Sequence, residues 1–143
     1  MMTQHSGMLR FVNGAHPFCL KLTSFMMHNQ SVGKKGEELA VIFLEKEGFA
    51  IIEINWRYKK CEVDIIACRS NFLHFIEVKT RTSGKYGYPE ESVTTKKMNN
   101  LKVAAEAFQY LYPQWKYIQF DVLAITLNKS SNPQYFFNQD VYF

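Results

Sequence analysis

A chain of 143 residues has the length of one ordinary domain and can bury a hydrophobic core of its own. Hydrophobic residues make up 47% of the chain and charged residues 21%, a balance that excludes a disordered protein. The formal net charge of +4 and the sequence pI near 8.9 permit a polyanionic partner without requiring one.

The apolar runs and the cysteines exclude two further classes of protein. No apolar run approaches the roughly 18 residues that span a bilayer, so we expect no membrane partner. The three cysteines (Cys19, Cys61 and Cys68) are an odd number without a CxxC pair, which argues against a disulfide framework or a structural zinc site. We therefore expect a cytoplasmic protein.

Residues 1–29 differ from the rest of the chain. They hold five of the six methionines and no acidic residue, and they show neither a helical nor a strand period. Polar residues interrupt any apolar run of the kind that a secretory signal needs. We interpret this stretch as a poorly structured extension, with Met26 or Met27 as a candidate natural start, and residues 30–143 as a single domain.

The first predicted helix covers residues 32–47. Its apolar residues fall on one stripe, with lysine and glutamate on the opposite side. Ser31 is suited to cap the start of this helix and Gly48 to cap its end.

Three strands are predicted to follow the helix, because β-branched and aromatic residues dominate three short segments. These segments are residues 49–56, 62–68 and 72–80. The turn composition Arg69-Ser70-Asn71 separates the last two, so at least this part of the sheet should be antiparallel.

A second helix and two strands complete the predicted order. Residues 82–91, with two glycines and a proline, predict a loop, and the helical period returns over residues 93–112. Residues 118–127 and 135–143 are the last predicted strands. The order of helix, three strands, helix and two strands predicts an α/β fold without internal repeats.

Three charged residues of the predicted hairpin are candidates for catalysis. Glu77 and Lys79 share one face of their strand, and a turn at Ser70-Asn71 puts Asp64 directly opposite Glu77. Two like charges so placed destabilise a sheet, and a divalent cation between them removes the repulsion. A lysine beside that cation could orient or deprotonate a water, or stabilise charge on a phosphate. The grouping is therefore suited to metal-dependent hydrolysis of phosphodiesters.

An ordered series of motifs surrounds these residues. It consists of Gly33-Lys-Lys-Gly36-Glu37-Glu38-Leu-Ala40, Asn55-Trp56-Arg57, Glu62-Val-Asp64-Ile-Ile, Phe75-Ile-Glu77-Val-Lys79-Thr-Arg81, Gly87-Tyr-Pro89, Ser92-Val93, Lys97 and Phe120-Asp121-Val122. The series resembles the YraN-like bacterial family of uncharacterised predicted endonucleases. That family is similar to archaeal Holliday junction resolvases and to restriction-endonuclease-like proteins with a PD-(D/E)xK motif. The resemblance covers about residues 33–125.

The resemblance implies a restriction-endonuclease-like αβββαβ core with a mixed central sheet flanked by helices. It implies that Asp64 and Glu77 bind Mg²⁺ or Mn²⁺, that Lys79 is the catalytic lysine, and that Glu37 reaches the same metal site. The candidate nucleic-acid-binding residues are Arg57, Arg81, Lys96 and Lys97. The family usually has glycine in place of Cys61 and often arginine in place of Gln119. The first difference changes the entry to a strand, and the second could remove a phosphate or carboxylate contact.

Each of these residues also has a purely structural interpretation. The E-x-K pattern on a strand is commonly a solvated ion pair worth under about 1 kcal/mol. The helix dipole favours an acid near a helix start, where Glu37 lies, whatever its function. A helix start with Lys96 and Lys97 is typical of a solvated face, and Trp56 and Asp121 could be a core residue and a buried hydrogen-bond partner.

Two functions from different classes follow from these patterns. The leading hypothesis is a Mg²⁺- or Mn²⁺-dependent endonuclease that hydrolyses DNA, including branched or damaged DNA. The alternative is a nucleic-acid-binding module with the same fold and little or no catalytic activity. Retention of both carboxylates and the lysine favours the enzyme. Resolvase relatives work as dimers, so a homodimer is a further partner to test.

Overall fold

The computed structural model of the protein describes residues 31–82, 94–129 and 131–141. Its elements are α2 (Val32–Lys46), β1 (Ala50–Tyr58), β2 (Cys61–Arg69), β3 (Phe72–Thr82), α3 (Thr95–Leu111), β4 (Tyr117–Leu127) and β5 (Gln134–Asn138). This order confirms the predicted αβββαβ core followed by a fifth strand. The extension predicted for residues 1–29 and most of the loop predicted for residues 82–91 lie outside the described residues. Within the described ranges, no helix is long and apolar enough to cross a membrane.

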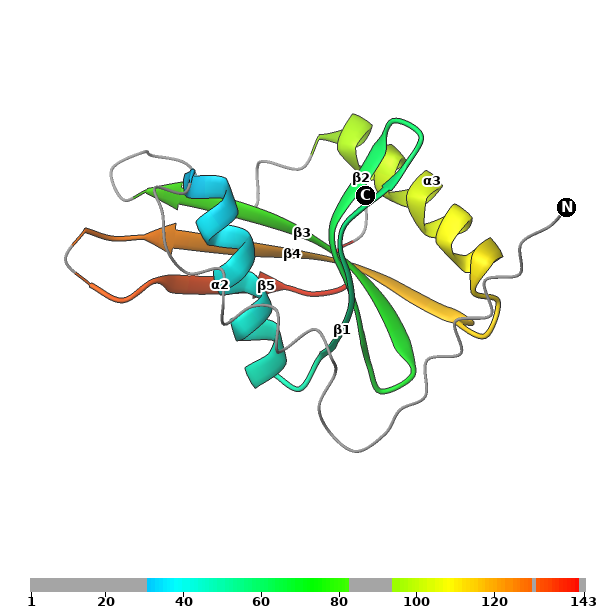
Figure 1. The fold of residues 1–143 in the computed structure, drawn as a ribbon, viewed down its shortest axis with the longest axis horizontal. Coiled ribbons are helices and arrows are strands. Elements are labelled where there is room, and N and C mark those ends of the chain that lie inside the picture. Colours follow the sequence, from blue (N-terminus) through cyan, green and yellow to red (C-terminus); the bar gives the residue numbers. More distant parts are fainter. Residues whose placement is uncertain (1–30, 83–93, 130, 142–143) are drawn as a thin grey trace, which may run out of the picture.

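The five strands form one mixed sheet in the order β1-β2-β3-β4-β5 (Figure 1). β3 and β4 run parallel, and the other neighbouring pairs are antiparallel. Parallel strands need a crossover connection, and α3 supplies it between β3 and β4. The prediction of a mixed central sheet is confirmed.

The two helices cover opposite faces of this sheet. Ile76 of β3 belongs to the core beneath α2, and its neighbour Phe75 belongs to the core beneath α3. Successive side chains of a strand point to opposite faces. Glu77 and Lys79 therefore lie on the face that α3 covers, in the same alternating set as Phe75.

The start of α2 follows the prediction, and its end differs by one position. The Ser31 side chain accepts a hydrogen bond from the Lys34 backbone N–H at 3.4 Å. Glu47, and not Gly48, occupies the C-cap position. Gly48 follows with a φ of 84°, which a residue without Cβ adopts easily.

The β2–β3 hairpin has the turn and the register that its sequence predicts. Ser70 and Asn71 both have positive φ, 50° and 66°, as the tightest antiparallel turns require. Ile66 pairs with Phe75 and Ile65 with Ile76, in the predicted register. The last strand is shorter than predicted: β5 ends at Asn138, and the residues after it follow β4 irregularly, with Asp140 at a φ of 56° and the Val141 N–H donating to the Phe120 carbonyl.

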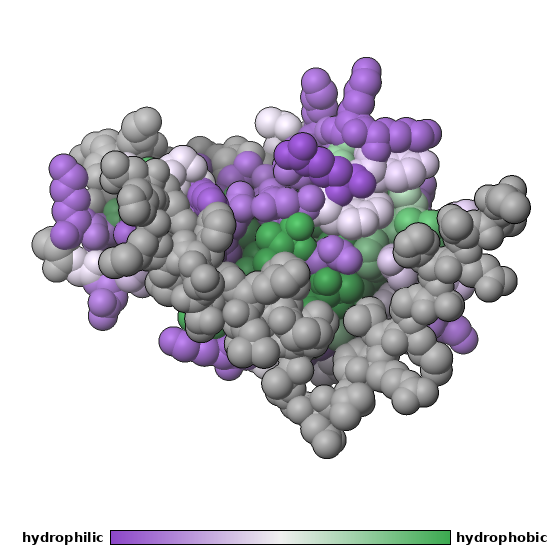
Figure 2. Space-filling model, in the orientation of Figure 1, coloured by the Kyte–Doolittle hydropathy of each residue, from purple (hydrophilic) through white to green (hydrophobic). Residues whose placement is uncertain are grey.

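The β1–β2 hairpin bends sharply partway along its length. Val63 packs in the core beneath α3, but Ile65, two residues later, packs in the core beneath α2. On a straight strand these two side chains would share one face. Asn55 of β1, which lies between the residues paired with Val63 and Ile65, has a φ of 53°, and this left-handed residue accommodates the bend. Hydrophilic side chains gather over the tip of the hairpin (Figure 2).

Candidate functional site

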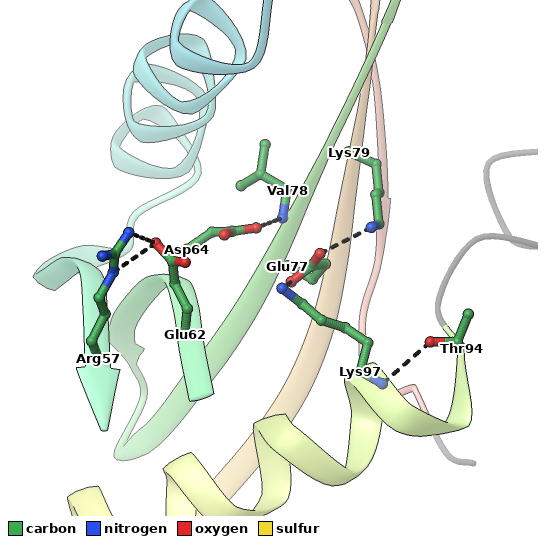
Figure 3. Close-up of polar contacts among 8 residues, drawn as sticks. All are labelled: Arg57, Glu62, Asp64, Glu77, Val78, Lys79, Thr94 and Lys97. Carbon is green, nitrogen blue, oxygen red and sulfur yellow. Dashed lines mark hydrogen bonds and ion pairs between the residues drawn. The ribbon is translucent and has the colours of Figure 1, made fainter. Parts of the chain in front are cut away.

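Asp64 lies where the bent hairpin separates from β3. The paired residues of β2 and β3 end at Ile65 and Ile76, and Asp64 and Glu77 are the next residues along each strand. Asp64 Oδ2 accepts a hydrogen bond of 2.8 Å from the Val78 backbone N–H. A side-chain carboxylate thus takes the place of a backbone acceptor. This bond orients Asp64 beside Glu77 (Figure 3).

Glu77 carries a buried negative charge between two lysines. Its side chain is 4% exposed, and its Oε1 lies 3.0 Å from Lys79 Nζ. Its Oε2 lies 3.1 Å from Lys97 Nζ, in an ion pair that is not a well-directed hydrogen bond. Lys79 approaches along β3 and Lys97 approaches from α3 (Figure 3). Because an unpaired buried charge is very costly, the two ammonium groups offset the burial of this carboxylate.

The site holds more carboxylate charge than its surroundings neutralise. The pKa of the Asp64 carboxyl is raised from 3.8 to about 7, first by burial and then by the negative charges of Glu77 and Glu37. The Val78 N–H and the Lys97 ammonium offset part of this rise. Asp64 therefore binds a proton close to neutral pH, because no neighbouring cation fully stabilises its ionised form.

Lys97 belongs to this site, which the sequence interpretation missed. Burial opposes its charge, but the ion pair with Glu77 raises the pKa of Lys97, and Asp64 and Glu62 contribute in the same direction. The sequence had assigned Lys97 only to nucleic-acid binding. The signal was the crossover: a helix that joins two parallel strands packs on one face of the sheet, and α3 covers the face of β3 that carries Glu77.

Glu37 approaches from the other layer and is held by a residue that was not predicted. Its Oε2 accepts a hydrogen bond of 3.0 Å from Asn55 Nδ2, at the bend of β1. Glu37 lies beyond the first turn of α2, which contains no acid, so the helix dipole does not account for it. In the described part of the chain, no three His, Cys, Asp or Glu side chains are grouped closely enough to hold a metal ion. Glu37, Asp64 and Glu77 are thus electrostatic neighbours and not a closed ligand set.

The remaining candidate basic residues are spread around the site. Arg57 is exposed on the hairpin and donates from Nε and one terminal nitrogen to Glu62 Oε1, at 3.2 and 3.0 Å. Arg81 follows Lys79 on the same face of β3, and Lys96 is exposed at the start of α3. Of the four basic residues predicted to bind nucleic acid, Lys97 forms an ion pair with Glu77, and Arg57 forms one with Glu62.

The structure also decides the alternatives for Asp121 and Trp56. Asp121 is buried, and its Oδ2 lies 2.6 Å from His74 Nδ1. Its Oδ1 accepts hydrogen bonds of 2.9 Å from Gln119 Nε2 and from the Asp140 backbone N–H. Gln119, the position where relatives often have arginine, therefore keeps a carboxylate contact. Asp121 is a buried hydrogen-bond partner, and Trp56 is a partly buried residue that packs edge to face on Phe108 of the core beneath α3.

Cys61, the other difference from the family pattern, begins β2. Its side chain is buried in the core beneath α3. A larger side chain than glycine is accommodated at this entry to the strand.

Comparison with known proteins identifies the family. The sequence model of the family described as "Uncharacterised protein family UPF0102" matches residues 36–125. The chain belongs to this family. A UPF0102 protein of Cytophaga hutchinsonii is 48% identical over 101 residues, which are 71% of this chain and 88% of that protein. Another, of Clostridium perfringens (strain 13), is 42% identical over 106 residues, 73% of this chain and 87% of that protein. The resemblance to this family, predicted from the motifs, is confirmed.

A search of solved structures found a more distant similarity. The chain is similar to Archaeoglobus fulgidus Hjc, described as a Holliday junction resolvase from an archaeal hyperthermophile. The TM-score is 0.42 and the identity 18%, over 72% of this chain and 74% of that one. A likeness at this level supports no inference about activity.

Proposed function

We propose that this UPF0102 protein is a metal-dependent endonuclease that hydrolyses phosphodiester bonds in DNA, including branched or damaged DNA. The observation that carries the proposal is the pair formed by Asp64 and Glu77, with Lys79 3.0 Å from Glu77. Glu77 is buried and Asp64 is half-buried, and burial together with the negative charge of Glu77 raises the pKa of Asp64 to about 7.

The donor set fits a hard divalent cation. Mg²⁺ is commonly held by one or two carboxylates together with water and substrate phosphates. Asp64 and Glu77 would be those carboxylates, and Glu37 lies close enough to raise the pKa of Asp64. Oxygen ligands without cysteine or histidine suit Mg²⁺ or Mn²⁺. When bound, such an ion polarises a phosphate and lowers the pKa of a bound water.

The protein's own groups would orient the reaction. The Val78 N–H holds Asp64 and the Asn55 amide holds Glu37, so both carboxylates are positioned before a substrate arrives. The Lys79 ammonium is 28% exposed and can reach a phosphate while it remains beside Glu77. There it would stabilise negative charge that develops on the phosphate, or orient the attacking water.

Basic side chains around the site would bind the phosphate backbone of nucleic acid. Arg57 lies on the β1–β2 hairpin with Lys59 and Lys60 at its tip, Arg81 lies on β3, and Lys96 is exposed at the start of α3. Such contacts give affinity without base specificity. A two-fold symmetric DNA branch would require two copies of the site, so a homodimer is part of the proposal.

The decisive experiment incubates the protein with linear, nicked and branched DNA in Mg²⁺, in Mn²⁺ and in a chelator. We expect metal-dependent cleavage that disappears in Asp64→Asn, whose side chain has nearly the same shape but lacks the charge. DNA binding without metal should persist in this variant, since one carboxylate fewer repels the phosphates. Equal cleavage by the variant, purified in the same way, would show that another site or a contaminant is responsible. Binding without cleavage under every condition would favour the alternative, a nucleic-acid-binding module, in which the two lysines already neutralise Glu77.

A further inference from the structure

The position of Lys97 differs from that of Lys79, although both lysines form ion pairs with Glu77. Lys79 lies on Glu77 Oε1, on the same strand, at 3.0 Å. Lys97 lies on Oε2 at 3.1 Å, and its charge also acts on Asp64. Lys97 is thus the cation that acts on both carboxylates of the pair.

The attachment of Lys97 allows its ammonium group to move while the helix stays in place. Its backbone N–H donates to Thr94 Oγ1 at 3.3 Å, a capping bond that fixes the first turn of α3. Its side chain is 32% exposed, and a lysine stem has four flexible carbons. The first turn of α3 contains no acid and carries Lys96 beside Lys97, and the start of a helix favours an anion. An ammonium that leaves Glu77 therefore remains close to a favourable place for a phosphate.

We infer that Lys97 is a resident counter-ion of the Asp64–Glu77 pair, which a divalent cation displaces from Glu77 and which then binds a nucleic-acid phosphate. This inference rests on the proposed function, because it assumes that the two carboxylates bind a metal ion. Lys97 acts here as a positioning residue. Without metal it neutralises part of the charge of the two carboxylates, and it couples metal binding to the affinity for DNA.

Removal of Lys97 should change the metal affinity in opposite directions, depending on whether Lys97 is a counter-ion or a purely structural lysine. If Lys97 competes with the cation, its removal must strengthen metal binding, because the cation no longer has to displace an ammonium group. If Lys97 only supports the local structure, its removal must weaken metal binding or leave it unchanged. Net charge alone would act equally at any nearby lysine, so an exposed lysine of the same helix, Lys102, serves as the control.

The experiment titrates Mn²⁺ into the full chain by calorimetry at low ionic strength. We expect Lys97→Met to bind Mn²⁺ at least tenfold more tightly than the wild type, and Lys102→Met to match the wild type. Lys97→Arg, which retains the charge, should also stay close to the wild type and shows that the position tolerates substitution. Circular dichroism and urea unfolding of each variant establish that it is folded.

A second measurement tests where the displaced ammonium goes. The salt dependence of DNA binding is recorded once with a chelator and once with Ca²⁺ as a probe. With the chelator, Lys97→Met should leave the slope of log K against log salt unchanged, since Lys97 is engaged with Glu77. With Ca²⁺, the slope of Lys97→Met should be shallower than that of the wild type by about 1, because one phosphate contact is lost.

Three results would overturn the inference. Mn²⁺ affinity that is equal or weaker in Lys97→Met would show that Lys97 is not a competitor, and the proposed metal site would still stand. Tightening of the same size in Lys102→Met would assign the effect to net charge. Absence of Mn²⁺ binding in the wild type and in every variant would overturn the proposed function and the inference together.

Discussion

Asp64→Asn should stabilise the protein, and the gain should depend on pH. The amide keeps the shape of the carboxylate, and its oxygen can still accept the hydrogen bond that the Val78 N–H donates to Asp64 at 2.8 Å. The charge that burial and the neighbouring carboxylates of Glu77 and Glu37 disfavour is removed. The substitution therefore isolates the electrostatic cost of the site from the hydrogen bond that holds it.

The magnitude follows from the pKa of Asp64 in the folded and unfolded states. Burial and Glu77 raise this pKa from 3.8 to about 7, so between these values the folded wild type binds more protons than the unfolded chain. Its stability must then fall as the pH rises from about 4 to about 7. A pKa difference of one corresponds to about 1.4 kcal/mol, so the full rise corresponds to roughly 4 kcal/mol. Since the partly exposed site can reorganise and admit water, we expect a loss of about 2–4 kcal/mol.

Urea unfolding in a chelator, from about pH 4 to pH 8, measures this loss. The free energies of unfolding of the wild type and Asp64→Asn should agree at the acid end, where Asp64 is protonated in both states. The difference should grow toward neutral pH and level off above about 7. Asp140→Asn, the same chemical change at an exposed position, is the matched control. If the free energies of unfolding of wild type and Asp64→Asn differ by the same amount at every pH, the raised pKa assigned to Asp64 is wrong.

Two further predictions concern packing and metal binding. Gly36→Ala should destabilise the fold by about 1–3 kcal/mol in urea unfolding, because a Cβ there would lie 1.7 Å from Thr80 Oγ1 and push α2 away from β3. Thr80→Ala in the same chain should recover part of the loss, and full stability of Gly36→Ala alone would contradict the close packing. The affinity for Mn²⁺, measured by calorimetry, should rise with pH through about 7, because Asp64 must release its proton to bind the ion. A flat pH profile would exclude Asp64 as a ligand.

Local sequence predicted the elements and the β2–β3 hairpin of this fold. The helical stripe after Ser31 and the strand segments are visible because burial on one side imposes a period on neighbouring residues. Ser70 and Asn71 specified a two-residue turn, and a two-residue turn specifies the register. The shared face of Glu77 and Lys79 followed from strand alternation alone, and their ion pair agrees with it.

Local sequence did not predict the residue at which β5 ends. The strand was predicted to continue to residue 143 because the chain returns to apolar and aromatic residues at positions 141–143. The strand ends because the Asp140 N–H donates to Asp121, a residue 19 positions earlier, which also pairs with His74. A buried hydrogen-bond partner so distant in sequence has no local signature.

The composition of the site depended most on the tertiary structure. The sequence by itself determined that Asp64, Glu77 and Lys79 lie on neighbouring strands, since strand pairing and alternation are local properties. That Lys97 reaches Glu77, and that Asn55 holds Glu37, depends on how α3 and the bent hairpin pack on the sheet. A lysine side chain can point in many directions from the start of a helix. Only the packing of the helix decides which carboxylate it meets.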